Sequence, residues 1–185
     1  MQFEFVVIDI SCVKDRLCKV DPDCGLMGLM VDAFGGRVVM DEMQLSKIDC
    51  CQNESPLYCE TSDEDVAEYI LNATPELQPR IKKIAEDPAD LRLLFFCVQK
   101  KGKSILLACD KALLYAADGY GVPHYCFKAA AGYADQKFGG NLSTEYDWHV
   151  IRSDGIDPFL NEKNNRYCSG CDPKKRCHHH RQHSN

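Results

Sequence analysis

Two aspartates in this sequence each end a run of apolar residues, and acids in that position could bind a divalent cation. Asp9 ends the apolar segment that begins at Phe3, and Asp110 follows the segment 104–109. Apolar runs of this kind are typical of strands buried on both faces of a parallel sheet. Ligands of open parallel sheets bind beyond the carboxyl ends of the strands. We therefore expect Asp9 and Asp110 to lie along one edge of a sheet.

Two further acids could reach the same edge. Asp90 lies close to the start of a predicted helix, and Glu42 lies near the start of another, with Asp41 as an alternative to Glu42. Carboxylate oxygens suit Mg²⁺ or Mn²⁺, and two such ions about 4 Å apart stabilise the attacking and leaving oxygens of phosphodiester cleavage. Without a cation, clustered carboxylates repel one another and raise one another's pKa. The predicted catalytic and metal-binding residues are therefore Asp9, Glu42, Asp90 and Asp110.

Each of these acids also has a purely structural interpretation. Asp9 and Asp110 could be ordinary loop or turn residues, and Asp110 could cap a helix. Asp90 could be a helix N-cap, because a side-chain oxygen at that position accepts a hydrogen bond from the first helical turn. We expect two neighbouring acids, Asp87 and Asp118, to be solvated.

The C-terminal segment contains a second group of possible ligands. Cys168 and Cys171 form a C-x₂-C pair, with Cys177 and several histidines shortly after it. A tight turn between paired cysteines places both thiolates on one tetrahedral zinc ion. We predict a Cys₃His zinc site completed by His180, or alternatively by His183. The alternatives are a basic tail without zinc and a redox pair of Cys168 and Cys171.

The chain that positions these residues alternates between strand and helix patterns. This alternation indicates βαβ units and an α/β fold with a mostly parallel sheet. The apolar periodicity and cap residues predict strands over 3–10, 104–109 and 124–127, helices over 21–33, 62–72, 75–85, 87–102 and 111–117, and a loop over 49–62. We expect one domain over residues 1–160 and a polar, basic tail over 161–185.

The charge of the sequence is distributed unevenly. The net charge of −6 divides into −11 over residues 1–162 and +5 over residues 163–185. A simple nucleic-acid-binding domain usually presents a basic face. An acidic body with a basic tail instead suits a body that concentrates carboxylates around cations and a tail that contacts phosphates. A solvated acidic surface explains the body equally well, but not the tail.

Composition groups the chain with globular proteins rather than with membrane or disulfide-rich proteins. Hydrophobic residues make up 45% and charged residues 27%, and no apolar run approaches the roughly 18 residues that span a bilayer. Several of the twelve cysteines lie in apolar runs such as 95–98, where a free cysteine behaves as a small buried hydrophobe. The N-terminus lacks the basic region of a signal peptide. We therefore predict a cytoplasmic protein with reduced thiols.

The acids and their flanking residues resemble those of the PIN-domain nucleases. The matching segments are Val6-Val7-Ile8-Asp9-Ile10-Ser11, then Glu42, then Asp90-Leu91-Arg92-Leu93-Leu94, then Ile105 to Leu114, and finally Tyr120-Gly121-Val122-Pro123. The closing block resembles the family most, with a strand, Asp110, an apolar helix and a Gly-Val turn into another strand. The resemblance covers about residues 1–130 and implies a PIN-like three-layer sandwich.

The resemblance also implies a function. It implies a metal-dependent endoribonuclease that cleaves RNA with Mg²⁺ or Mn²⁺, in which Ser11 hydrogen-bonds a ligand carboxylate or a water. An antitoxin-like inhibitor, another protein partner or self-association would be compatible with it, and no membrane partner is expected. One alternative is an inactive PIN-like module that binds RNA or acts as a protein scaffold. Another is a different metal phosphohydrolase, or a 5′-nuclease-type fold that acts on DNA.

Overall fold

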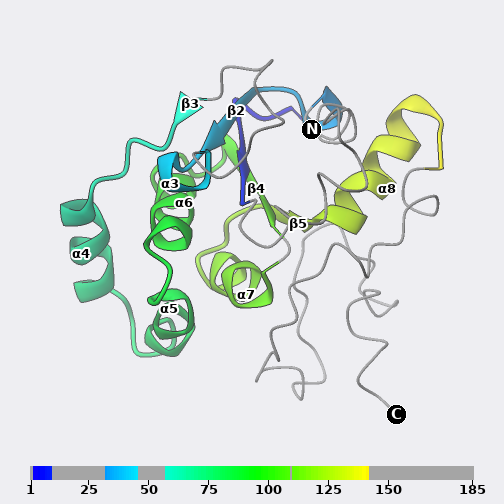
Figure 1. The fold of residues 1–185 in the computed structure, drawn as a ribbon. Helices are drawn as coiled ribbons and strands as arrows, with labels where there is room; N and C mark the ends of the chain where they lie inside the picture. The colour runs from blue at the N-terminus through cyan, green and yellow to red at the C-terminus, as the bar shows by residue number, and fades with distance from the viewer. Residues whose placement is uncertain (1, 10–31, 46–56, 109, 142–185) are drawn as a thin grey trace, which may run out of the picture.

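The computed structural model describes residues 2–9, 32–45, 57–108 and 110–141. Within them, five strands form one sheet in the order β3-β2-β1-β4-β5 (Figure 1). The strands are β1 Phe5–Ile8, β2 Arg37–Met40, β3 Leu57–Tyr58, β4 Ser104–Ala108 and β5 His124–Cys126. All four pairs of neighbouring strands are parallel. The predicted α/β fold with a parallel sheet is thereby confirmed.

The helices lie between and after these strands. They are α3 Glu42–Leu45, α4 Asp63–Leu71, α5 Gln78–Ile84, α6 Pro88–Gln99, α7 Lys111–Gly119 and α8 Phe127–Phe138. The predicted helices over 62–72, 75–85, 87–102 and 111–117 correspond to α4, α5, α6 and α7. Ser62 caps α4 as expected: its hydroxyl accepts from the Asp65 backbone at 3.1 Å, while Asp65 accepts from the Ser62 backbone at 3.0 Å. The predicted helix over 21–33 lies almost entirely outside the described residues.

Two elements differ from the sequence-based expectation. Leu57 and Tyr58 form β3 and pair with Val39 and Met40, so the prediction of a loop over the whole of 49–62 is wrong at these residues. A strand of two residues is too short to show alternation in the sequence. Helix α8 was also not expected, because most of its buried side chains are small and give a weak apolar period. Those small residues are Ala130, Ala131 and Ala134.

Successive side chains of β1 enter two separate cores. Phe5 and Val7 belong to the core that α4, α5, α6 and α7 cover, whereas Val6 and Ile8 belong to a second core that Phe34 and α8 cover. Figure 1 shows α8 on the other side of the sheet from α6. Helices therefore pack on both faces, which explains why β1 is buried along its whole length.

The described cysteines and helices bear on two further expectations. Cys59 and Cys97 are thiols rather than disulfides. Cys97 is fully buried in α6, which confirms the interpretation of its apolar run, and burial raises the pKa of its thiol. Among the described residues, every helix is too short or too polar to cross a membrane.

Candidate carboxylate site at the sheet edge

Asp9 and Asp110 follow the carboxyl ends of two neighbouring strands, β1 and β4. The register of β1 and β4 places Ile8 next to Leu107, and the Asp9 backbone N–H donates to the Leu107 carbonyl at 2.9 Å. Asp110 comes two residues after the end of β4. Chain progression through the sheet reverses between β1 and β4, and ligands of such sheets bind beyond the strand ends at this point. Both acids therefore lie at the edge where a ligand is expected.

Asp9 is the most deeply buried of the four predicted acids. Its side chain is fully shielded from solvent. The carboxamide nitrogen of Gln44, in α3, donates to Asp9 Oδ1 at 2.9 Å, and this contact is also buried. A carboxylate that is buried and held by a side chain 35 residues away is not an ordinary solvated loop residue.

Asp90 is buried among the other acids. Its exposed fraction is 5%, and Oδ1 has no hydrogen-bond partner within the described residues. Burial raises the pKa of Asp90 to about 10, with the charges of Asp9, Asp87, Asp110 and Asp41 adding to the increase in that order. Asp90 therefore lies within electrostatic reach of Asp9 and Asp110, and at neutral pH its carboxyl group is protonated.

The N-cap of α6 is Asp87 rather than Asp90. Asp87 Oδ1 accepts from the Ala89 backbone N–H at 3.0 Å, so Asp87 is a half-buried cap and not the solvated acid that the sequence suggests. Asp90 follows Ala89, the residue whose backbone amide Asp87 caps, and so lies inside the first turn of α6. The structural interpretation of Asp90 as a cap is therefore wrong, and its burial needs another explanation.

Asp110 combines a structural role with its place at the site. It is the N-cap of α7, and its Oδ1 accepts from the Leu113 backbone N–H at 2.9 Å. Its side chain is half-buried, and its charge contributes to the raised pKa of Asp90. Capping by one oxygen fixes where the Asp110 carboxylate lies, in the same way that Gln44 fixes Asp9.

Glu42 and Asp41 occupy different environments although they are adjacent. Glu42 is exposed at the first position of α3 and is not among the charges that act on Asp90. Asp41 is buried, with an exposed fraction of 2%, and does act on Asp90. The described structure thus places Asp41, and not Glu42, on the side of the carboxylate cluster.

Asp41 is already neutralised by a cation of the chain itself. Arg92 Nε lies 2.7 Å from Asp41 Oδ2, and a second Arg92 nitrogen lies 3.2 Å from Oδ1. This pairing raises the pKa of the Arg92 guanidinium further above its usual range. The other terminal nitrogen of Arg92 contacts Asp63 at 3.1 Å. All three guanidinium nitrogens of Arg92 therefore contact neighbouring acids, which leaves none of them unpaired for a phosphate.

The cluster satisfies some requirements of a cation site. Within the described ranges, no group of three or more His, Cys, Asp or Glu side chains is gathered closely enough to hold a metal ion. Asp90 nevertheless has a buried oxygen without a described hydrogen-bond partner and lies within electrostatic reach of other carboxylates, and carboxylate oxygens are what Mg²⁺ and Mn²⁺ prefer. By its chemistry the donor set of Asp9, Asp90 and Asp110 fits such a cation, although these residues do not by themselves form a coordination shell.

Ser11, Cys168, Cys171, Cys177 and His180 lie outside the described residues, as does the domain boundary near residue 160.

Two residues at the site, Gln44 and Arg92, were not predicted from the sequence. Gln44 stands three positions after Asp41, and an acid followed three residues later by Gln is a signature of a capped helix start. That signal would have placed Asp41 at the helix cap and Gln44 beside it. Arg92 gave no comparable signal, because its partner Asp41 is 51 residues away in the chain.

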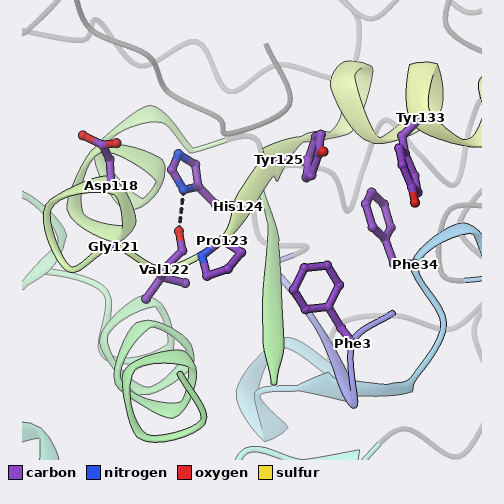
Figure 2. Close-up of a pocket in the computed structure, with 9 residues that line it drawn as sticks. All are labelled: Phe3, Phe34, Asp118, Gly121, Val122, Pro123, His124, Tyr125 and Tyr133. Atoms are coloured by element: carbon purple, nitrogen blue, oxygen red, sulfur yellow. Dashed lines mark hydrogen bonds between the residues drawn. The ribbon is translucent and has the colours of Figure 1, made fainter. Parts of the chain in front are cut away.

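A separate pocket of about 540 Å³ lies near the opposite ends of the strands (Figure 2). One side is formed by Asp118, Val122, Pro123 and His124, whose Nδ1 donates to the Val122 carbonyl at 2.7 Å. The other side is aromatic, with Phe34 stacked on Tyr133 at 4.8 Å between ring centres. These rings pack against one another, and the only charged lining residue among those described is acidic. The pocket is therefore unsuited to phosphate and distinct from the carboxylate cluster.

No protein-family model, curated protein or solved structure matches this chain in sequence or fold.

Proposed function

We propose that this chain is a metal-dependent endoribonuclease whose active site is the cluster of Asp9, Asp90 and Asp110. The observation that carries the proposal is the buried Asp90 carboxyl group, which lies within electrostatic reach of other carboxylates and has an oxygen without a described hydrogen-bond partner. An unsatisfied buried polar group costs on the order of 1–3 kcal/mol. Strongly perturbed carboxyl groups of this kind concentrate at functional sites, and a cation would offset the cost.

The three acids would share the work of holding Mg²⁺ or Mn²⁺ and activating water. A cation held there supplies charge that stabilises the phosphodiester oxygens during cleavage. Asp9, fully buried and fixed by Gln44, serves as a rigid ligand. Asp90 gives up its proton when the cation binds. Asp110 is the least buried of the three, and its carboxylate accepts the proton of the attacking water.

RNA as the substrate rests on the resemblance to PIN-domain nucleases and on the charge of the tail. The acidic body offers little attraction to phosphates, whereas residues 163–185 carry a charge of +5. In the proposal, the tail binds zinc through Cys168, Cys171, Cys177 and a histidine, and holds RNA near the cluster. A protein inhibitor or self-association would regulate access to it.

A second candidate function is a PIN-like module without activity that binds RNA or a protein. Two observations favour it. Within the described residues the acids do not form a complete metal site. In addition, both carboxylate oxygens of Asp41, the acid nearer the cluster than Glu42, are already paired with Arg92.

Cleavage of single-stranded RNA by the full chain, with Mg²⁺ or Mn²⁺, separates the two functions. We expect the wild-type protein to cut RNA and the variants Asp9→Asn and Asp110→Asn to lose cleavage while staying folded, because each substitution removes a ligand and relieves repulsion. Glu68→Gln on the exposed surface of α4 is the matched control and should retain activity. Wild-type-like cleavage by Asp9→Asn and Asp110→Asn would refute the site. A wild-type protein that binds RNA without cutting it would favour the second function, and cleavage confined to DNA would point to a 5′-nuclease-type activity.

A further inference from the structure

We infer that Gln44 is a positioning residue for Asp9, and that an ion pair between Arg92 and Asp41 fixes the helix that carries Gln44. The inference rests on the proposed cation-binding function of the carboxylate cluster and adds to it a supporting set of residues that does not touch the cation. The set comprises Arg92 on α6, Asp41, and Gln44 on α3, and it connects the two proposed ligands Asp90, on α6, and Asp9, at the end of β1.

The ion pair at one end of this set is shielded and has two points of contact. The Arg92 and Asp41 side chains are 15% and 3% exposed, and the two nitrogen–oxygen distances are 2.7 and 3.2 Å. A guanidinium that holds both oxygens of a carboxylate fixes its orientation as well as its position. Because Arg92 lies two residues after Asp90, the same turn of α6 carries an acid of the cluster and the anchor for α3.

Asp41 transmits this position to α3. Asp41 Oδ1 accepts from the Met43 backbone N–H at 2.9 Å, and the Asp41 carbonyl accepts from the Gln44 backbone N–H at 3.0 Å. Helix α3 comprises only Glu42–Leu45, and a helix of one turn does not form without external support. Asp41, held by Arg92, supplies that support.

Gln44 is the point at which α3 meets the cluster. Its side chain is 2% exposed, and its Nε2 donates to Asp9 Oδ1 at 2.9 Å. The amide nitrogen can only donate, so the contact fixes which Asp9 oxygen faces α3. Hydrogen bonds to a ligand carboxylate set its orientation, and their loss typically lowers metal affinity or activity by 10–100-fold.

The test is Mn²⁺ binding and RNA cleavage by the full chain carrying Gln44→Met, which keeps the length of the side chain and removes the donor. We expect Mn²⁺ affinity and kcat to fall by about 10–100-fold, with little change in the KM for RNA. The urea midpoint should fall as well, because the buried Asp9 oxygen loses its donor. A role confined to stability would shift the midpoint and leave the affinity of the folded protein unchanged. Gln99→Met, an exposed position at the end of α6, is the matched control. Arg92→Lys keeps the charge, loses the two-point contact, and should weaken Mn²⁺ binding in the same direction.

A measurement on the wild-type protein keeps the inference testable even if Gln44→Met does not fold. The side-chain amide signals of Gln44 should be protected from exchange and should shift on Mg²⁺ titration, because Gln44 contacts a ligand. If the wild-type protein binds Mn²⁺ and Gln44→Met binds it with unchanged affinity, the inference is overturned while the proposed function stands. The same holds if the Gln44 amide signals of a cation-binding wild-type protein do not respond to Mg²⁺. A wild-type protein that binds neither cation would overturn the proposed function as well.

Discussion

Arg92 holds Asp41 through contacts of 2.7 and 3.2 Å, so the acid that directly follows β2 is paired within the protein. Its neighbour Glu42 is exposed. The two adjacent acids can therefore be separated by experiment, since one is part of a buried ion pair and the other is not.

We predict that Asp41→Asn lowers the free energy of unfolding by about 2 kcal/mol, as expected for the loss of a charged hydrogen-bond partner. Glu42→Gln should change it by less than about 0.5 kcal/mol, as surface substitutions usually do. Urea denaturation of both variants at pH 7 measures the difference. Equal effects would mean that the ion pair does not stabilise the fold, and a loss of cleavage in Glu42→Gln alone would restore Glu42 as a ligand.

Asp90→Asn should be more stable than the wild-type protein at neutral and alkaline pH in the absence of divalent cations. The folded pKa of Asp90, about 10, lies above its unfolded value, so between about pH 4 and pH 10 the folded state binds a proton that the unfolded state releases. Wild-type stability therefore falls through this window as the pH rises, and the advantage of Asp90→Asn should grow by about 1.4 kcal/mol for each pH unit within it. Below pH 4 the advantage should disappear. An advantage that is independent of pH would contradict the raised pKa.

Mg²⁺ or Mn²⁺ should stabilise the wild-type protein and release a proton as it binds. Saturation at about 100 times the dissociation constant would add about 2.7 kcal/mol. The proton comes from Asp90, and it can be counted by calorimetry in two buffers of different ionisation enthalpy. Asp90→Asn should show weaker binding and no such proton. Binding without proton release in the wild-type protein would mean that Asp90 is not a ligand.

The C-terminal cysteines provide a prediction that is independent of the carboxylates. Protein purified without chelator should contain about one equivalent of zinc, bound by deprotonated thiolates. Replacing Cys168 and Cys171 with serine should release it and should weaken RNA binding with a smaller salt dependence, because the basic segment supplies the contacts to phosphate. Metal analysis and RNA titrations at several salt concentrations test this. Protein free of zinc, or a disulfide between Cys168 and Cys171, would rule out the zinc site.

The position of Asp9 and Asp110 could be predicted because it depends on local signals and on one rule of topology. Each acid follows a strongly apolar strand, and parallel strands bring their carboxyl ends to one edge. The distinction between Asp41 and Glu42 could not be made in this way. The spacing from Asp41 to Gln44 indicates a helix cap at Asp41, but the burial of Asp41 depends on its tertiary partner Arg92.

The supporting residues were harder to predict for a related reason. A hydrogen bond from Gln44 to Asp9 and an ion pair from Arg92 to Asp41 join positions far apart in the chain, and neither affects the local apolar period. Asp90 is intermediate: its place in the first turn of α6 was foreseeable, but its burial depends on how α6 packs against the sheet edge.

The central pairing of the sheet also determines the order in which the protein can assemble. Phe5 and Ser104 are partners in β1 and β4 although 99 positions separate them in the chain. Closing so long a loop is entropically costly, and contacts between distant residues slow folding. During synthesis β1 is made before β4. Until β4 is made, the edge of β1 that pairs with β4 has unpaired backbone groups that could bind other chains. Asp9 and Asp110 come together only when β4 pairs with β1. The repulsion between them therefore arises after most of the apolar surface, whose burial stabilises the fold against it, has been buried.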